Sequence, residues 1–133
     1  MKTLIVVAAI IIYDDRILCM QRQSGKYEYI SNKYEFPGGK VEENESNSVA
    51  LMRELEEEMD LNVLISEEDY FMSIDHEYPD FHIIMHSYLC HVDHPNFNMK
   101  EHAAYQWLLR EDLSQLDWAP ADLPIVNRLI EGD

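Results

Sequence analysis

Positively charged residues are scarce in this chain. Its 133 residues include 10 Lys and Arg against 26 Asp and Glu, which gives a formal net charge of −16. Proteins that bind nucleic-acid polymers or anionic membranes usually present a basic surface, so this charge balance argues against both kinds of partner. A small polyanion is compatible with such a protein only where a cation bridges the two.

Cysteine is equally rare. Cys19 and Cys90 are too few for a disulfide framework and fit a reducing compartment. The N-terminal apolar run, residues 3–12, is too short to span a bilayer, and no small-residue cleavage pattern of a signal peptide follows it. Its β-branched residues favour a buried strand instead, and we expect a cytoplasmic protein.

The sequence has little glycine or proline that could form a linker between domains. Its four glycines and five prolines are scattered, with no linker, repeat or low-complexity tract, which predicts one domain over residues 1–133. The expected elements are strands over 3–12 and 17–22 joined by a turn at 14–15, a helix from a cap at Ser46 or Asn47 to about Met59, strands over 63–75, 81–92 and 103–109, and a helix over 124–130. Strands mixed with two helices favour an α/β fold in which helices cover a sheet.

The first of these helices has an acidic face. Glu54, Glu57 and Glu58 stand at i, i+3 and i+4, so a helix places their carboxylates side by side. Like charges at these spacings repel, whereas a hard divalent cation held by oxygen ligands would remove the repulsion. Spacing alone leaves two interpretations open, a metal site and a solvated acidic face.

A longer motif surrounds these glutamates. Gly39 is followed by five residues, Glu45, seven residues, and then Arg53-Glu54-Leu55-Glu56-Glu57-Glu58-Met59-Asp60-Leu61. This pattern resembles the Nudix box, the signature of hydrolases that act on nucleoside diphosphates linked to another group. One fixed position differs, because Asp60 stands where the family has the glycine that ends the helix in a left-handed conformation. Asp tolerates that conformation better than most residues do.

The resemblance extends to residues 34–42 and 116–124, which look like the MutT-type branch and most resemble its CTP pyrophosphohydrolases. It implies the Nudix fold, an α/β/α sandwich around a mixed β-sheet, over most of the chain. It also implies that Mg²⁺ or Mn²⁺ is bound by Glu54, Glu57, Glu58 and the carbonyl of Gly38, ligands that suit a hard cation.

The resemblance assigns supporting roles as well. Glu54 is the first choice for orienting or deprotonating the attacking water. Arg53 would hold one of the glutamates by a bidentate pair, and Glu45 is a candidate partner for it. Glu101 matches a position where related enzymes place a further metal-ligating or water-orienting glutamate, although the sequence alone gives no preference for it over Glu111 or Asp112.

Four residues are candidates for binding the substrate. Arg22 matches a phosphate-binding arginine of MutT-like relatives, and Lys40 is a weaker candidate for the same work. Asp122 and Phe81 stand where guanine-directed relatives have Asn and Arg. A carboxylate accepts hydrogen bonds and therefore suits the exocyclic amine of cytosine, and Phe81 could stack on a pyrimidine. The alternative for Asp122 is a cap of the last helix.

These observations predict a Mg²⁺-dependent Nudix pyrophosphohydrolase that cleaves a (deoxy)nucleoside triphosphate, such as a cytosine nucleotide, to the monophosphate and pyrophosphate. One alternative is a Nudix hydrolase of an oxidised purine nucleotide or of another nucleoside diphosphate derivative. An alternative of another class is a non-catalytic module that binds divalent cations. The expected partner is a small nucleotide, and the oligomeric state stays open, with a homodimer among the outcomes.

Overall fold

A central mixed sheet organises the computed structural model, which describes residues 1–132. The strands are β1 (Lys2–Tyr13), β2 (Arg16–Gln21), β3 (Tyr34–Glu35), β4 (Gly38–Lys40), β5 (Tyr70–Glu77), β6 (Phe81–His91) and β7 (Ala104–Leu108). The main order is β3-β2-β1-β6-β5, with β4 paired to β1 and β7 paired to β2. The β1–β6 pair is parallel and the other pairs are antiparallel.

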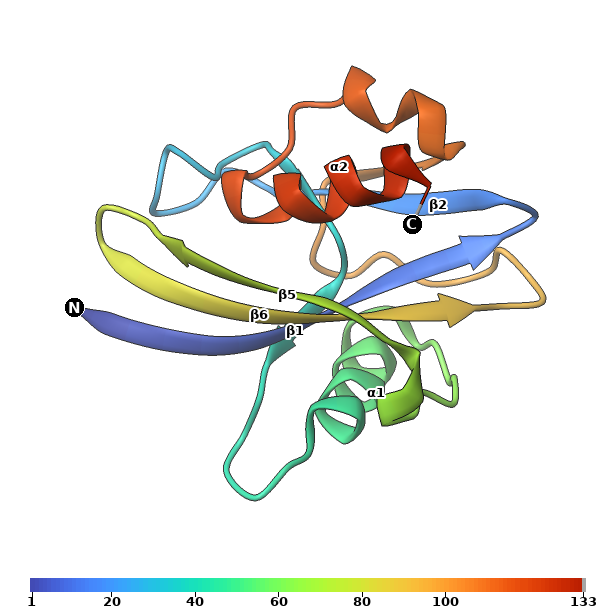
Figure 1. Cartoon of the computed structure of the whole chain (residues 1–133), viewed down its shortest axis with the longest axis horizontal. Coiled ribbons are helices and arrows are strands. Elements are labelled where there is room, and N and C mark those ends of the chain that lie inside the picture. The colour runs from blue at the N-terminus through green and yellow to red at the C-terminus, as the bar shows by residue number, and fades with distance from the viewer. Residues whose placement is uncertain (133) are drawn as a thin grey trace.

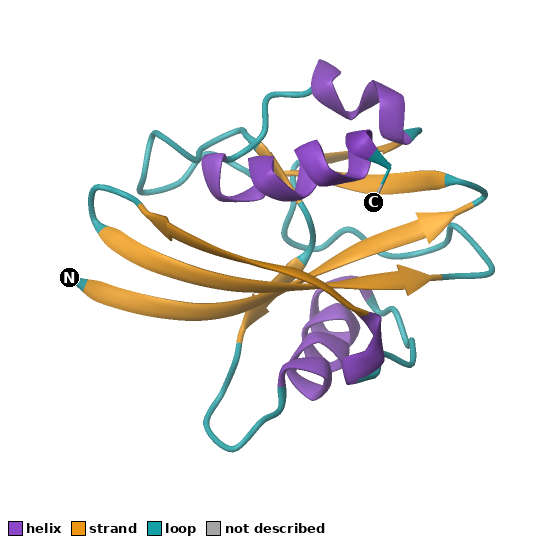
Figure 2. Cartoon of the chain, viewed as in Figure 1, coloured by secondary structure: helices purple, strands orange, loops and turns teal. Residues whose placement is uncertain are grey.

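Helices cover both faces of this sheet, as the sequence predicts (Figures 1 and 2). Helix α1 (Asn47–Met59) packs on one face, and α2 (Leu123–Glu131) packs on the other beside a 3₁₀ turn over Arg110–Gln115. Strand β1 contributes side chains to the core on both faces of the sheet, because successive residues of a strand point to opposite faces. Ile10 lies in the core under α2, whereas Ala9 and Ile11 lie in the core under α1.

The sequence prediction is accurate for several elements. The turn between β1 and β2 is formed by Asp14 and Asp15, whose φ angles of 50° and 62° are those of a tight hairpin turn. Helix α1 begins after Ser46, whose Oγ accepts a hydrogen bond from the amide of Val49. None of the helices within residues 1–132 has the length and apolar character needed to cross a membrane.

Two predictions about secondary structure are wrong. The strand expected over 63–75 starts only at Tyr70, because the side chain of Asp69 accepts from the amide of Ser66 and closes a 3₁₀ turn ahead of the strand. Leu64 lies 97% exposed in the irregular stretch before it. Asp122 precedes α2, but its side chain makes no capping hydrogen bond within the described chain. Its carboxylate instead accepts from the amide of Phe36, across the molecule.

Candidate active site

Helix α1 carries the acidic cluster on the side away from its core contacts. Leu51, Leu55 and Met59 are buried against the sheet, which fixes the rotation of the helix about its axis. The helix ends at Asp60, whose φ of 52° and ψ of 33° place it in the left-handed region. The aspartate therefore adopts the conformation that the motif glycine provides, as the sequence predicts.

Two consecutive glycines bring the backbone of β4 close to both neighbouring elements. A Cβ atom on Gly38 would lie 1.9 Å from the carbonyl oxygen of Val7 in β1. A Cβ atom on Gly39 would lie 2.2 Å from Oε2 of Glu54 in α1. Only glycine allows these approaches, so the Gly38-Gly39 pair places the Glu54 carboxylate directly against the β4 backbone.

Arg53 connects the acidic residues of α1 to the loop before the helix. Its Nε and Nη2 donate to the two carboxylate oxygens of Glu45 at 2.7 and 2.9 Å, a bidentate pair. Its Nη1 donates to Glu54 and Glu57, both at 3.2 Å, and Nη2 also donates to the carbonyl of Lys40. The Arg53 guanidinium lowers the pKa of Glu45 to about 2. The pairing predicted for Arg53 and Glu45 is therefore present.

Glu58 has a carboxylate oxygen that is buried among the acidic residues of α1. Its Oε2 is inaccessible to solvent and has no hydrogen-bond partner within residues 1–132. Burial, followed by the nearby charges of Glu101 and Glu54, raises the pKa of Glu58 to about 8. A buried carboxylate oxygen without a partner is costly, and a divalent cation would satisfy both this oxygen and the neighbouring charges.

The predicted metal-binding carboxylates are not arranged around a common point. No group of three or more His, Cys, Asp or Glu side chains within residues 1–132 stands close enough to hold a metal ion. The side chain of Glu57 is 60% exposed and turned toward Arg53. The donors nevertheless fit a hard cation, because they are oxygens from neighbouring positions and one of them is unsatisfied.

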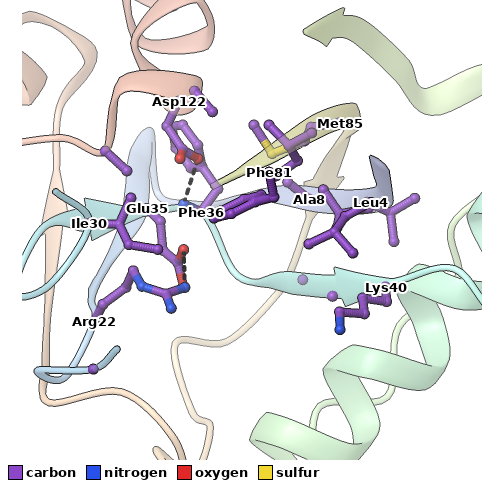
Figure 3. Close-up of a pocket in the computed structure, with 18 of the residues that line it drawn as sticks. Leu4, Ala8, Arg22, Ile30, Glu35, Phe36, Lys40, Phe81, Met85 and Asp122 are labelled. Atoms are coloured by element: carbon purple, nitrogen blue, oxygen red, sulfur yellow. Dashed lines mark hydrogen bonds and ion pairs between the residues drawn. The ribbon is translucent and has the colours of Figure 1, made fainter. Parts of the chain in front are cut away.

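A cavity of about 1200 Å³ opens beside this cluster and extends under α2. On its wall Arg22 donates from Nη1 to Glu35 Oε1 at 3.1 Å (Figure 3). His102 Nε2 lies 2.9 Å from Glu35 Oε2. Arg22 Nε is buried without a partner within the described residues. The sequence pattern alone indicates no role for Glu35 or His102, although Glu35 lies inside the segment 34–42 that carries the resemblance.

The opposite end of the cavity is aromatic and contains one buried acid. The ring of Phe81 lies 5.2 Å from that of Tyr27 and 5.1 Å from that of Tyr78, centroid to centroid. Asp122 is 5% exposed, and its Oδ1 accepts from the amide of Phe36 at 3.3 Å (Figure 3). Burial, with a smaller contribution from Glu35, raises the pKa of Asp122 well above its usual range.

The family model of the NUDIX domain matches residues 3–129. The chain belongs to the Nudix family. The CTP pyrophosphohydrolase of Escherichia coli (strain K12) is 37% identical over 127 residues, which are 96% of this chain and 91% of that protein. The 8-oxo-dGTP diphosphatase of the same strain is 30% identical over 129 residues, 97% of this chain and 98% of that protein.

A solved structure agrees with the fold. The solution NMR structure of DNA mismatch repair protein MutT, a Nudix hydrolase from methicillin-resistant Staphylococcus aureus 252, superimposes with a TM-score of 0.75 at 37% identity. The match covers 100% of both chains. The predicted Nudix fold, with helices on both faces of a mixed sheet, is therefore confirmed.

In this Nudix protein most of the predicted site residues line one cavity. Those that line the cavity are Arg22, Gly38, Lys40, Glu54, Glu58, Phe81, Glu101 and Asp122. Arg53 and Glu57 do not line it, and they contact each other beside it. The cavity thus has a carboxylate end at α1 and an aromatic end under α2, which suits an elongated ligand with a charged part and a planar part.

The raised pKa of Glu58 predicts a pH-dependent stability of the metal-free protein. The pKa rises from an ordinary 4.5 to about 8 on folding, so between these values the folded state binds the proton more tightly. Stability should then fall as pH rises from about 5 to about 8, and Glu58→Gln should flatten this decline. Urea unfolding in EDTA across this range measures the effect. An equally steep decline in the variant would contradict the assignment to Glu58.

Proposed function

We propose that this protein is a Mg²⁺-dependent pyrophosphohydrolase of nucleoside triphosphates. The observation that carries the proposal is the buried Glu58 Oε2, which has no hydrogen-bond partner within residues 1–132, beside Glu54 and Glu101 in a cavity of about 1200 Å³. The reaction adds water across a phosphoanhydride bond and yields the nucleoside monophosphate and pyrophosphate. The names of both curated relatives support a hydrolase of phosphorus anhydrides, and nothing supports the non-catalytic alternative.

The metal would be held by the carboxylates of α1, with two further donors, one from β4 and one from the segment before β7. These ligands are Glu54, Glu57, Glu58, Glu101 and the carbonyl of Gly38. Glu57 must rotate away from Arg53 to join them, because its side chain is now turned to the guanidinium. When bound, Mg²⁺ supplies Lewis-acid polarisation of the phosphoryl oxygens and neutralises their charge.

The residues of the chain orient the reactants. Burial raises the pKa of the Glu54 carboxyl, which favours acceptance of a proton from the attacking water. Arg53 fixes Glu54 through its Nη1. Arg22 lies on the cavity wall, and its Nη1 is held by Glu35 while Nε is unpartnered, so the guanidinium is positioned to donate to a phosphate.

Pyrophosphate release from a panel of nucleotides tests this function. The panel contains dCTP, CTP, 5-methyl-dCTP, dGTP, 8-oxo-dGTP, dUTP and ADP-ribose, each with Mg²⁺. We expect turnover of at least one triphosphate and its loss in Glu57→Gln. Turnover of ADP-ribose alone would support the hydrolase of a diphosphate derivative, and no turnover of any nucleotide would contradict the proposal.

The identity of the base depends on the protonation of Asp122. An ionised Asp122 accepts a hydrogen bond from the cytosine amine, whereas a protonated Asp122 also donates to an acceptor such as guanine O6. Since burial raises its pKa, the structure favours the second candidate, an oxidised guanine nucleotide, more than the sequence does. Cytosine turnover relative to guanine turnover should increase with pH if the ionised form reads the base.

Substituting Asp122→Asn should change base preference. Asn keeps an acceptor for the amide of Phe36 but is neutral at every pH. We expect kcat/KM for cytosine nucleotides to fall about 5- to 100-fold, the effect of losing one good base contact, with a smaller loss for 8-oxo-dGTP. The matched control is Asp117→Asn, an exposed residue of the same segment that pairs with Lys33. Equal losses for all bases would contradict a role in base recognition.

A further inference from the structure

Asp60 replaces the motif glycine and adds a side chain that glycine cannot supply. Both residues can end α1 in the left-handed conformation, but glycine does so without steric cost. The carboxylate of Asp60 accepts from Lys100 Nζ at 2.8 Å and from Asn98 Nδ2 at 2.6 Å. The replacement therefore creates two contacts between the end of α1 and a segment about forty residues further along the chain.

That segment, residues 92–103, joins β6 to β7 and contains Glu101 directly after Lys100. It has no helix or strand, so its position depends on individual contacts. The ring of Phe97 packs against those of Tyr105 and Trp107, and Gln23 Nε2 donates to the carbonyl of Glu101 at 3.2 Å. The amide of Asn98 donates to the carbonyl of Met59. The contacts of Asp60 add two side-chain links, at Asn98 and at Lys100, immediately before Glu101.

The charges around Glu101 act against its position. The carboxyl of Glu101 lies beside those of Glu58 and Glu54, and each of these groups that is ionised in the metal-free protein pushes the segment away from α1. The Asp60–Lys100 ion pair opposes this force at the adjacent residue. Both partners are about half exposed, so the pair contributes little to global stability while still restricting a segment that has no helix or strand.

We propose that Asp60 is a positioning residue: through Lys100 and Asn98 it holds Glu101 against Glu58 at the carboxylate end of the cavity. The proposal rests on the proposed function, because it concerns the glutamate that would complete the metal site. Replacing Asp60 with the glycine of the family motif should therefore lower activity, although glycine adopts the left-handed conformation at the helix end without steric cost.

The test compares Asp60→Gly, Lys100→Met and the double variant with the wild-type protein. Amide hydrogen exchange over residues 95–103 reports the segment without any substrate or metal, and kcat and the half-saturating Mg²⁺ concentration report Glu101. We expect faster exchange in this segment, an unchanged melting temperature, and kcat at fixed Mg²⁺ lowered about 10- to 100-fold. Asp93→Gly, the same change at an exposed residue of this segment, is the matched control.

The outcomes are separable. The double variant should be no worse than Asp60→Gly, because Asp60→Gly already removes the ion pair that Lys100→Met removes. Wild-type exchange in Asp60→Gly, or faster exchange with unchanged kcat and Mg²⁺ dependence, would overturn the proposal. If Asp60→Gly does not fold, the same exchange and kinetic measurements on Lys100→Met test the proposal, because this variant keeps the helix end intact. If the wild-type protein has no activity, the proposed function is contradicted. The exchange data would still show whether Asp60 holds the segment.

Discussion

Glu54→Gln is expected to lower kcat by about 10²- to 10⁴-fold, the range for removing a general base. The substitution keeps the shape of the side chain, which lies against Gly39, but removes its charge and its ability to take a proton. The free energy of unfolding should change little. Burial already disfavours the charged form of this carboxylate, as its raised pKa shows, so a neutral amide of the same shape is tolerated. Steady-state turnover at a saturating concentration of a triphosphate that the panel identifies gives kcat, and a single-turnover measurement isolates the chemical step.

Glu56→Gln is the matched control for this variant. Glu56 lies two positions along the same helix and is exposed on another side of it. Its variant should keep wild-type activity. A titration with Mg²⁺ then separates the two roles of Glu54: a pure ligand defect is relieved at high Mg²⁺, whereas loss of the base persists at saturation. A decrease of less than about 10-fold at all Mg²⁺ concentrations would contradict both roles.

The elements with strong periodicity were predictable from the sequence. Strand β1 is apolar and buried over residues 7–12 because both of its faces are covered there, and α1 carries Leu51, Leu55 and Met59 at four-residue intervals. By contrast, β3 and β4 contain two and three residues, too few for any period to be visible. The stretch before Tyr70 has the composition of a strand, but a local side-chain turn at Ser66 competes successfully with it.

The candidate site likewise contains residues that the sequence predicts and residues that it does not. Glu54, Glu57 and Glu58 were predictable because their spacing within one helix fixes which face they share. The contact of Glu35 with His102 joins residues that are 67 positions apart, and that of Asp122 with Phe36 joins residues 86 positions apart. Such contacts depend on the pairing of β2 with β3 and β7 rather than on local pattern. The raised pKa of Asp122 follows from burial, which the sequence does not show.

The adjacent glycines of β4 should respond differently to the same small substitution. In Gly38→Ala the new Cβ would meet the Val7 carbonyl oxygen at 1.9 Å and the Ala8 Cα at 2.9 Å, both backbone atoms of the central strand. These atoms cannot move without breaking the β1–β4 pair, so we expect a loss of unfolding free energy of about 3 kcal/mol, at the upper end of overpacking effects. Urea denaturation measures it.

In Gly39→Ala the new Cβ would meet only the end of the Glu54 side chain, at 2.2 Å from Oε2. That carboxylate can rotate away, so the fold should lose less than about 1 kcal/mol while Glu54 leaves its place beside the β4 backbone. Activity should then fall about 100-fold, with a melting temperature near that of the wild-type protein. Comparable stability losses in the two variants, or full activity in Gly39→Ala, would contradict the role of Gly39 in seating Glu54.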